Sequence, residues 1–419
     1  MVHQTIPTKI NPAPRASSKR SVMRRVCAWC CGVAILGTLA ACGSAPPLPV
    51  EAPASVVAPV VPAAATVTAP VAAPLPTESA PLNAGPVITR ARSRWVPVPW
   101  SELAGLEQDQ LDQAWNAWIK SCERSAGLPP ALAALCPQVR ALSIAGPTEQ
   151  YAWMKSRLQP YRVESLQGET WGLLTAYFEP LVDGSRTAIA PYGVPLYNPP
   201  AGLAGRKPWY TRQEMDTLPE AQAALKGRAV AYLADPVDAL ILQIQGSGRI
   251  RVLQPDGSTR ISRLAFAGTN EQPYKSVGKW LLDQGLVKDA SWPGIKAWLA
   301  QNPQRQQELL WSNPRMVFFR EEPLSDMDAD YGPRGAQGVA LTAGRSIAID
   351  PGSMPYGTPV WLVSAGPQTA LQKLVIAQDT GSAITGAVRA DYFAGWGPQA
   401  GELAGRLKQP LQMWVLWPK

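Results

Sequence analysis

"AQDTGSAITGAVRADYFAGWG" (residues 377–397) is the segment most informative about the fold, because it contains two aspartates, Asp379 and Asp391, among glycines and other small residues. An earlier stretch, "SIAIDPGSMPYGTPVWL" (residues 346–362), carries a third aspartate, Asp350. Asp350 and Asp379 each follow an apolar, strand-like run and precede a turn, where an isolated aspartate usually bonds to its own backbone. Three such residues, with Gly and Thr at the sharp corners, instead predict an intertwined barrel with carboxylates around a groove.

Strand-like segments recur along the chain after residue 94. They alternate, are rich in β-branched or aromatic residues, and are bounded by Gly, Pro or Asp: "LLTAYF", "AVAYLA", "ALILQIQGSGRIRVL", "VALTAGRSIAI", "PVWLV", "KLVIAQD" and "MWVLW". Apolar residues at helical spacing predict a helix within 101–127, capped by Ser101, and more helices within 274–287, 293–303 and 305–314. The sequence therefore predicts a mixed fold, mainly β with helices (α+β).

The first 41 residues predict a secretory signal, since a basic stretch leads into an apolar run that contains no acidic residue. The run ends in "LAAC" (residues 39–42), which is similar to the lipobox of bacterial lipoproteins. That pattern predicts lipidation of Cys42, and the lack of an aspartate just after it favours the outer membrane. The alternative is an ordinary cleavage site followed by a chance cysteine.

Residues 42–94 are dominated by Pro, Ala and Val and predict a disordered tether. A proline-rich chain extends by about 3.1 Å per residue, so this segment is long enough to hold a domain well away from a membrane. A spacer of no particular length is equally compatible with the composition.

The residue inventory excludes several kinds of chemistry. The only histidine, His3, lies in the predicted signal, so Ser-His-Asp and Cys-His catalysis are excluded. Loss of the signal also removes six of the 39 basic residues against 31 acidic ones, and the small remaining net charge does not indicate a nucleic-acid binder. Cys122 and Cys136 are left with Cys42, and two thiols without an imidazole do not predict a zinc site. They could form one disulfide in an oxidising compartment.

Several segments together resemble the membrane-bound lytic murein transglycosylase A family. The C-terminal stretches "AIDPGSMPYGTPVWL" and "AQDTGSAITGAVRADYF" look like its three-aspartate double-psi β-barrel domain, and "LLTAYFEP" (173–180) and "LQIQGSGRI" (242–250) are similar to its other signatures. "YKSVGKWLLDQG" and "LLWSNPRMVFF" are similar too. The resemblance covers residues 95–419 in the family's order.

The resemblance implies a double-psi β-barrel catalytic domain and a smaller inserted β-barrel domain, with the substrate cleft between them. We place the main domain at 95–181 and 311–419, and the insertion at 182–310. Clefts between domains are common ligand sites.

The resemblance also implies an activity: cleavage of the β-1,4 bond between N-acetylmuramic acid and N-acetylglucosamine of peptidoglycan, with formation of a 1,6-anhydro ring and without metal or cofactor. By motif, the catalytic acid and base is Asp391, although its spacing from Asp379 is longer than the family's. Asp379 is expected to shape the groove, and Asp350 to be structural. The residues that match substrate-binding signatures are Thr175, Tyr177, Gln245, Gly246, Ser247 and Gly248.

A lone carboxyl group suits this reaction. It must hold its proton near neutral pH, and burial beside Tyr392, Phe393 and Trp396 is expected to raise its pKa. Ordinary glycosidases need a second carboxylate for water or for covalent attack, whereas here the sugar's own 6-hydroxyl attacks. Glu179, in "YFEP", is a rival acid.

Two other functions stay open: a non-catalytic peptidoglycan-binding outer-membrane lipoprotein, and a hydrolysing muramidase. The expected partners are peptidoglycan glycan strands, the outer membrane on its periplasmic side, and other cell-wall enzymes, with no nucleic acid.

Overall fold

The computed structural model describes residues 85–254, 256, 258–325, 328–367 and 369–419. The predicted signal, Cys42 and the tether up to residue 84 lie outside the described residues. Within the described part of the chain, no helix has the length and apolar character needed to cross a bilayer.

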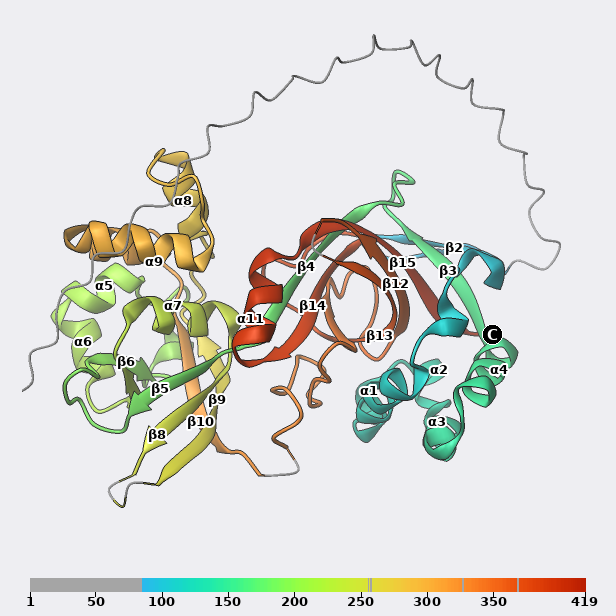
Figure 1. The fold of residues 1–419 in the computed structure, drawn as a ribbon, viewed down its shortest axis with the longest axis horizontal. Coiled ribbons are helices and arrows are strands. Elements are labelled where there is room, and N and C mark those ends of the chain that lie inside the picture. Colours follow the sequence, from blue (N-terminus) through green and yellow to red (C-terminus); the bar gives the residue numbers. More distant parts are fainter. Residues whose placement is uncertain (1–84, 255, 257, 326–327, 368) are drawn as a thin grey trace, which may run out of the picture. The chain divides into compact units, whose positions relative to one another are not determined.

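A nine-stranded sheet forms the larger β structure (Figure 1). Its order is β1-β2-β3-β15-β12-β13-β11-β14-β4, and β15 also pairs with β4. Six strands, from β15 through β12, β13, β11 and β14 to β4, therefore close into a ring. Its strands are β1 (Ile88–Thr89), β2 (Arg94–Pro97), β3 (Leu158–Glu164), β4 (Gly172–Glu179), β11 (Ser346–Ile349), β12 (Pro359–Ala365), β13 (Ala370–Asp379), β14 (Arg389–Trp396) and β15 (Lys408–Pro418).

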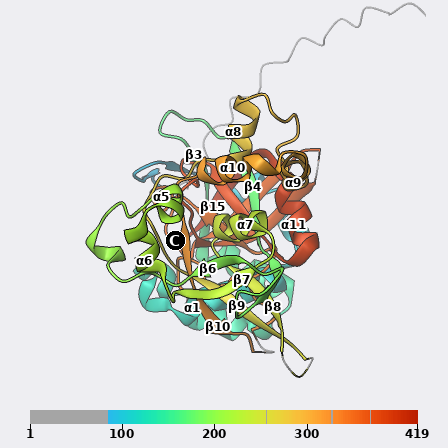
Figure 2. The same ribbon diagram turned by 90° about the vertical axis from the view of Figure 1, so that its left-hand side faces the viewer.

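A second sheet has six strands in the order β10-β9-β8-β5-β7-β6. These are β5 (Leu181–Ser185), β6 (Val194–Tyr197), β7 (Ala229–Leu233), β8 (Gly248–Leu253), β9 (Thr259–Thr269) and β10 (Val317–Pro323). The associated helices are α5 (Arg212–Thr217), α6 (Pro219–Leu225), α7 (Pro236–Gln245), α8 (Val277–Asp283), α9 (Trp292–Gln301) and α10 (Gln306–Trp311). In Figures 1 and 2, α8 and α9 lie at the end of this region opposite β8.

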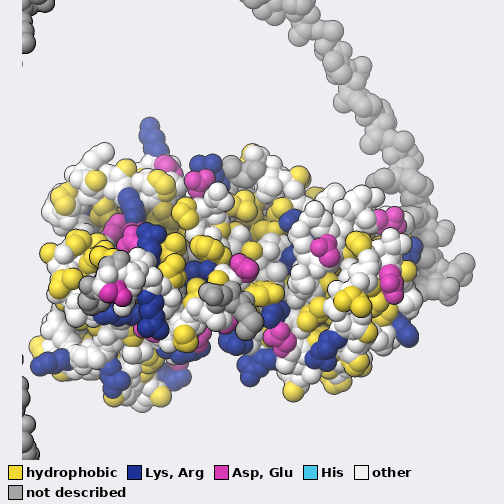
Figure 3. All heavy atoms as spheres, turned by 60° about the horizontal axis from the view of Figure 1, so that its bottom comes forward, with side chains coloured by type: hydrophobic (Ala, Val, Ile, Leu, Met, Phe, Trp, Pro, Cys, Tyr) yellow, Lys and Arg dark blue, Asp and Glu magenta, His cyan; other side chains and the backbone are white. Residues whose placement is uncertain are grey.

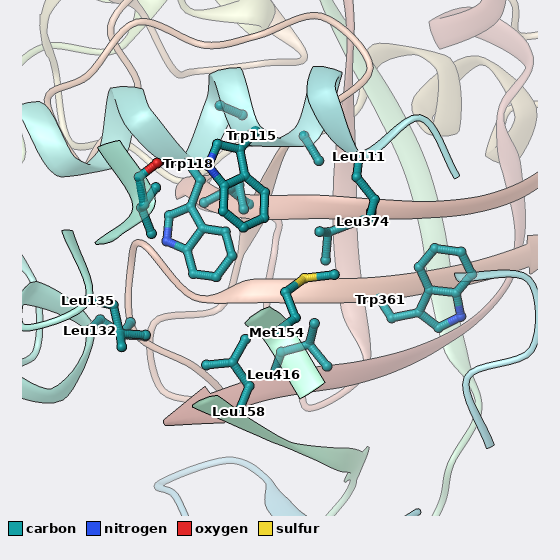
Figure 4. Packing of buried hydrophobic residues seen from close by; sticks show 14 of the residues in the cluster. Leu111, Trp115, Trp118, Leu132, Leu135, Met154, Leu158, Trp361, Leu374 and Leu416 are labelled. Carbon is teal, nitrogen blue, oxygen red and sulfur yellow. Dashed lines mark hydrogen bonds between the residues drawn. The ribbon is translucent and has the colours of Figure 1, made fainter. Parts of the chain in front are cut away.

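Three helices contact the nine-stranded sheet, α1 (Leu111–Glu123), α2 (Pro130–Ala133) and α4 (Pro147–Arg157), and α3 (Cys136–Ala141) packs against α1. Trp115 and Trp118 of α1 are 1% exposed and point toward Met154 of α4 (Figure 4). The same apolar cluster includes Trp361 of β12 and Leu416 of β15. A last helix, α11 (Gly397–Arg406), follows β14 and contacts β4.

Two long-range links hold the helices in place. Cys122 and Cys136 form a disulfide between α1 and α3, which realises the pairing that the sequence left open. Arg345, 1% exposed, donates to both carboxylate oxygens of Asp109, at 2.7 and 3.0 Å, just before α1. Asp109 also accepts from the backbone nitrogen of Leu374 in β13, so this ion pair ties the segment that precedes α1 to the ring.

The α+β prediction is confirmed, but several local predictions are wrong. The strand expected in "ALILQIQGSGRIRVL" is helix α7 followed by β8. Asp235 caps the helix by accepting from Val237 N at 2.7 Å, Pro236 is its first residue, and Gly246 ends it at φ 81°. Each is a standard helix signal that the apolar run obscured.

Other predicted boundaries of elements and domains also differ from those in the structure. Ser101 does not cap α1, which begins at Leu111 after two 3-10 turns. Only Ser346–Ile349 of the expected strand "VALTAGRSIAI" is a strand. Residues 88–94, assigned to the tether, belong to the β1–β2 pair. β10, assigned to the main domain, pairs with β9 of the six-stranded sheet, and β5 begins at Leu181, one residue before the expected insertion.

Acidic and basic side chains are interspersed over the face drawn in Figure 3.

Candidate active site

One row of residues crosses four strands of the ring. Parallel pairing of β4 with β14 sets Thr175 beside Asp391. β11 lies between β14 and β13, and its Ala348 pairs with Asp391 on one side and Asp379 on the other. Since neighbouring strands are about 4.8 Å apart, the α-carbons of the two aspartates are about 10 Å apart.

A β-bulge between β11 and β13 aligns Asp379 with Ala348 and so places it in this row. The β11–β13 register runs from Ile347 opposite Ala377 to Ala348 opposite Asp379, so it skips Gln378. Without the extra residue Gln378 would stand opposite Ala348. Bulges commonly re-aim a side chain next to a functional site.

Asp391 is partly exposed, and its Oδ1 accepts a hydrogen bond from the Thr175 hydroxyl. Burial raises the pKa of Asp391 above its ordinary value, and the Thr175 hydrogen bond and the Arg389 charge oppose that rise. The carboxyl group is therefore held in surroundings that favour retention of its proton.

Asp379 is engaged on both oxygens. Oδ1 accepts from the backbone nitrogens of Ala336 at 2.8 Å and Thr380 at 2.9 Å, and Oδ2 accepts from the Tyr177 hydroxyl at 2.9 Å. Burial raises the pKa of Asp379, and these hydrogen bonds oppose it. The Tyr177 ring in turn packs on Phe393, with centroids 5.2 Å apart.

These side chains line a cavity of about 360 Å³. Both sheets contribute: the ring supplies the aspartate row, and the other side comes from α7, β9, β10 and the segment before β10. Among the predicted residues, those that line it are Thr175, Tyr177, Gln245, Gly246, Asp379 and Asp391. The Gln245 Oε1 also accepts from Phe178 N at 3.1 Å, which fixes the end of α7 against β4.

Three predicted residues do not line this cavity. Ser247 is 6% exposed, and Gly248 starts β8 where a β-carbon would fall 2.8 Å from Leu242. Gly248 is thus explained by packing. Asp350 is 6% exposed and accepts from Gly352 N and Gly386 N, both at 2.8 Å. Asp350 thereby ties two loops together.

Glu179 is fully buried and paired, so it lies away from the cavity. It accepts from Arg249 Nε at 2.8 Å and Arg263 Nε at 2.6 Å.

The prediction that Tyr392, Phe393 and Trp396 all surround Asp391 is wrong for two of the three. Tyr392 packs in the core of the ring and Trp396 is 43% exposed over Arg249, so only Phe393 lies on the Asp391 side of β14.

Sequence reasoning missed several residues that line the cavity: Gln243, Phe266, Tyr274, Asn313, Arg315 and Arg389. Arg389 was open to prediction, because it stands two positions before Asp391 on a strand and so shares its face. The others come from the six-stranded sheet region, and only the fold brings them to the ring. The described residues contain no group of three or more His, Cys, Asp or Glu side chains placed to hold a metal.

Comparison with known proteins identifies the family. The model "MltA specific insert domain" matches residues 173–320, and the "3D domain" model matches residues 345–417. The lytic transglycosylase LtgG of Burkholderia pseudomallei is 40% identical, with a TM-score of 0.55, over 81% of this chain and 99% of that chain. The chain belongs to the membrane-bound lytic murein transglycosylase A family.

Other members of the family agree. MltA of Neisseria gonorrhoeae matches with a TM-score of 0.67 and 29% identity, over 81% of this chain and 96% of that chain. Escherichia coli MltA with bound chitohexaose matches with a TM-score of 0.59 and 25% identity, over 81% and 99%. The curated membrane-bound lytic murein transglycosylase A of Vibrio cholerae is 30% identical over 58% of this chain, and the match spans 65% of that relative's length.

Proposed function

We propose that this protein is a peptidoglycan lytic transglycosylase that cleaves the β-1,4 bond between N-acetylmuramic acid and N-acetylglucosamine. Asp391 is its general acid and then its general base. Family membership supports the reaction class, and the chitohexaose held by the E. coli relative supports a glycan in the cavity.

The first step needs an acid. The glycosidic oxygen is a poor leaving group, so Asp391 donates its proton to that oxygen as the bond to the anomeric carbon breaks. The raised pKa of Asp391 supports this role, because it keeps more of the carboxyl group protonated at a given pH.

The observation that carries the proposal is that both carboxylate oxygens of Asp379 are already hydrogen-bonded. An inverting hydrolase needs a second carboxylate free to activate water, and a retaining one needs a carboxylate close to the anomeric carbon. Asp379 already accepts three hydrogen bonds, two on Oδ1 and one on Oδ2. This leaves Asp391 as the carboxylate available for proton transfer in the cavity.

The second step then uses the sugar itself. The 6-hydroxyl oxygen of the muramic acid residue bonds to the anomeric carbon, and its proton passes to the ionised Asp391. The 6-hydroxyl proton thereby replaces the one that Asp391 gave to the leaving group and that stays on the released sugar, no water is consumed, and a 1,6-anhydro ring results. The substrate-facing groups are those of Thr175, Tyr177, Gln245 and Gly246.

We also propose that the protein acts on the periplasmic side of the outer membrane, anchored through lipidated Cys42. The "LAAC" motif and the Pro/Ala-rich tether support this location, and the relatives are named membrane-bound. Acyl chains add about 0.8 kcal/mol per buried methylene to membrane affinity. Radiolabelled palmitate incorporation in the wild type, absent from Cys42→Ala, tests the anchor.

Mass spectrometry of muropeptides released from purified cell wall tests the reaction. Anhydro ends are expected. Reducing ends would indicate a hydrolysing muramidase, and undigested wall would indicate a binding protein without turnover.

A further inference from the structure

Arg389 stands next to the proposed acid. It is the first residue of β14, two positions before Asp391, and both residues line the cavity. Its Nη2 donates to the Thr175 hydroxyl oxygen at 2.8 Å, and the same hydroxyl donates to Asp391 Oδ1. Arg389, Thr175 and Asp391 therefore form one hydrogen-bonded chain.

The direction of this chain follows from the donors. A guanidinium has no acceptor, so Thr175 must accept from Arg389. The single hydroxyl proton of Thr175 is then free to be donated to Asp391 Oδ1. An oxygen that accepts this bond does not carry the acid's own proton, which must lie on Oδ2.

We propose that Arg389 is a positioning residue that acts through Thr175 to fix the proton of Asp391 on Oδ2 and to steady the carboxylate after it has given that proton away. The inference rests on the proposed function, since it assigns Arg389 a part in the Asp391 proton transfer.

The charge of Arg389 has a second effect. It favours ionised Asp391 and so lowers the pKa of that carboxyl group against the larger effect of burial. Burial in turn lowers the pKa of Arg389 itself. The other charged or titratable groups that line the same cavity are Tyr177, Tyr274, Arg315 and Asp379. Asp391 therefore remains an acid, yet ionises readily enough to act as the base of the second step.

Arg389→Met in the full chain tests this role. Release of anhydromuropeptides is measured against pH for the wild type, Arg389→Met, Arg389→Lys and the control Arg406→Met, which removes an exposed arginine from α11. We expect kcat to fall by about 10- to 100-fold in Arg389→Met, at or below the lower end of the range that general acid–base catalysis contributes, because Asp391 itself is retained. The alkaline limb of its kcat profile should move to higher pH. Arg389→Lys should lie closer to the wild type on both counts, and Arg406→Met should match the wild type.

Carbon-13 NMR of labelled aspartate carboxyls, assigned with Asp391→Asn, gives a readout that does not depend on turnover. The pKa of Asp391 should be higher in Arg389→Met than in the wild type. An unmoved pKa and alkaline limb, or a rise in KM with kcat unchanged, would overturn the positioning role while leaving the proposed function intact. A wild type that releases no anhydro product would overturn both.

Discussion

The Tyr177 hydroxyl donates a 2.9 Å hydrogen bond to Asp379 Oδ2, and this bond joins two strands on opposite sides of the six-stranded ring. β4, which carries Tyr177, and β13, which carries Asp379, are separated by two strands in either direction around the ring. The bond therefore spans the ring beside Asp391 and holds the Asp379 carboxylate in place.

Loss of the Asp391 carboxyl group should abolish catalysis and spare binding. In Asp391→Asn the amide has no proton to give to the glycosidic oxygen, so anhydromuropeptide release should fall by at least about 10²-fold, the lower end of the range for general acid–base catalysis. Binding to purified wall, measured by co-sedimentation, should stay within about threefold because the cavity keeps its shape. Activity near the wild-type level in this variant would falsify the assignment of the acid.

Removal of the Tyr177 hydroxyl should lower both stability and rate. Tyr177→Phe deprives the half-buried Asp379 of a donor, which should cost about 1–3 kcal/mol of unfolding free energy and reduce kcat by displacing the Asp379 carboxylate. The matched control is Tyr392→Phe, which loses a partly buried 3.1 Å hydrogen bond to Gly344 O on the other face of β14. The control should lose stability without a comparable loss of kcat in the muropeptide assay. Equal kcat losses in the two variants would argue against a specific role for Tyr177.

The raised pKa of Asp391 has consequences for both rate and stability. Its protonated form is the acid, so kcat should be lost as pH rises through the folded-state pKa. The pKa of Asp391 is higher in the folded state than in the unfolded state. Its contribution to the free energy of unfolding is therefore fully present below the unfolded-state pKa and is lost as pH rises through the folded-state pKa. Asp391→Asn, which keeps no charge, should therefore be more stable relative to the wild type near neutral pH than near pH 4. Thermal unfolding at the two pH values measures this, and a difference that does not change with pH would contradict it.

Reduction of the Cys122–Cys136 disulfide should destabilise the helices while leaving the cavity unaffected. The bridge closes a loop with a sequence separation of 14 residues, for which chain entropy predicts about 3 kcal/mol. Calorimetry with and without a reductant should show a lower unfolding temperature. Anhydromuropeptide release at 25 °C should be unchanged, because neither cysteine lines the cavity. A loss of activity at that temperature would link the helices to the site.

The buried Asp109–Arg345 pair should be costly to break. Asp109→Ala leaves the guanidinium of Arg345 buried without its carboxylate, which should reduce the unfolding free energy by about 3–5 kcal/mol. The control is Asp183→Ala, whose partner Arg251 is 47% exposed, and loss of that solvent-screened pair should lower stability far less. Denaturant unfolding of the two variants gives the comparison, and equal losses would show that burial of the Asp109 pair adds nothing.

Much of the fold could be predicted because its signals are local. The strands that lead into Asp350 and Asp379 lie within segments where period-2 patterns and turn residues predicted strands, whereas β14, which carries Asp391, was not predicted as a strand. The missed helix α7 shows the limit of that approach, since its apolar run suits either a strand or a buried helix. Its caps, Asp235 and Gly246, carried the deciding signal.

The α+β class, the family, the exclusion of histidine chemistry and the prediction of Asp391 follow from the amino-acid sequence, because they depend on residue identity and short-range pattern. Which candidates meet depends on the fold, in which Thr175 reaches Asp391 across 216 residues, Tyr177 donates to Asp379, and Glu179 is buried between two arginines. The physical reason is that strand register and burial are set by contacts between distant segments. A side chain's partners, and with them its pKa and its chemistry, are fixed only once those segments pair.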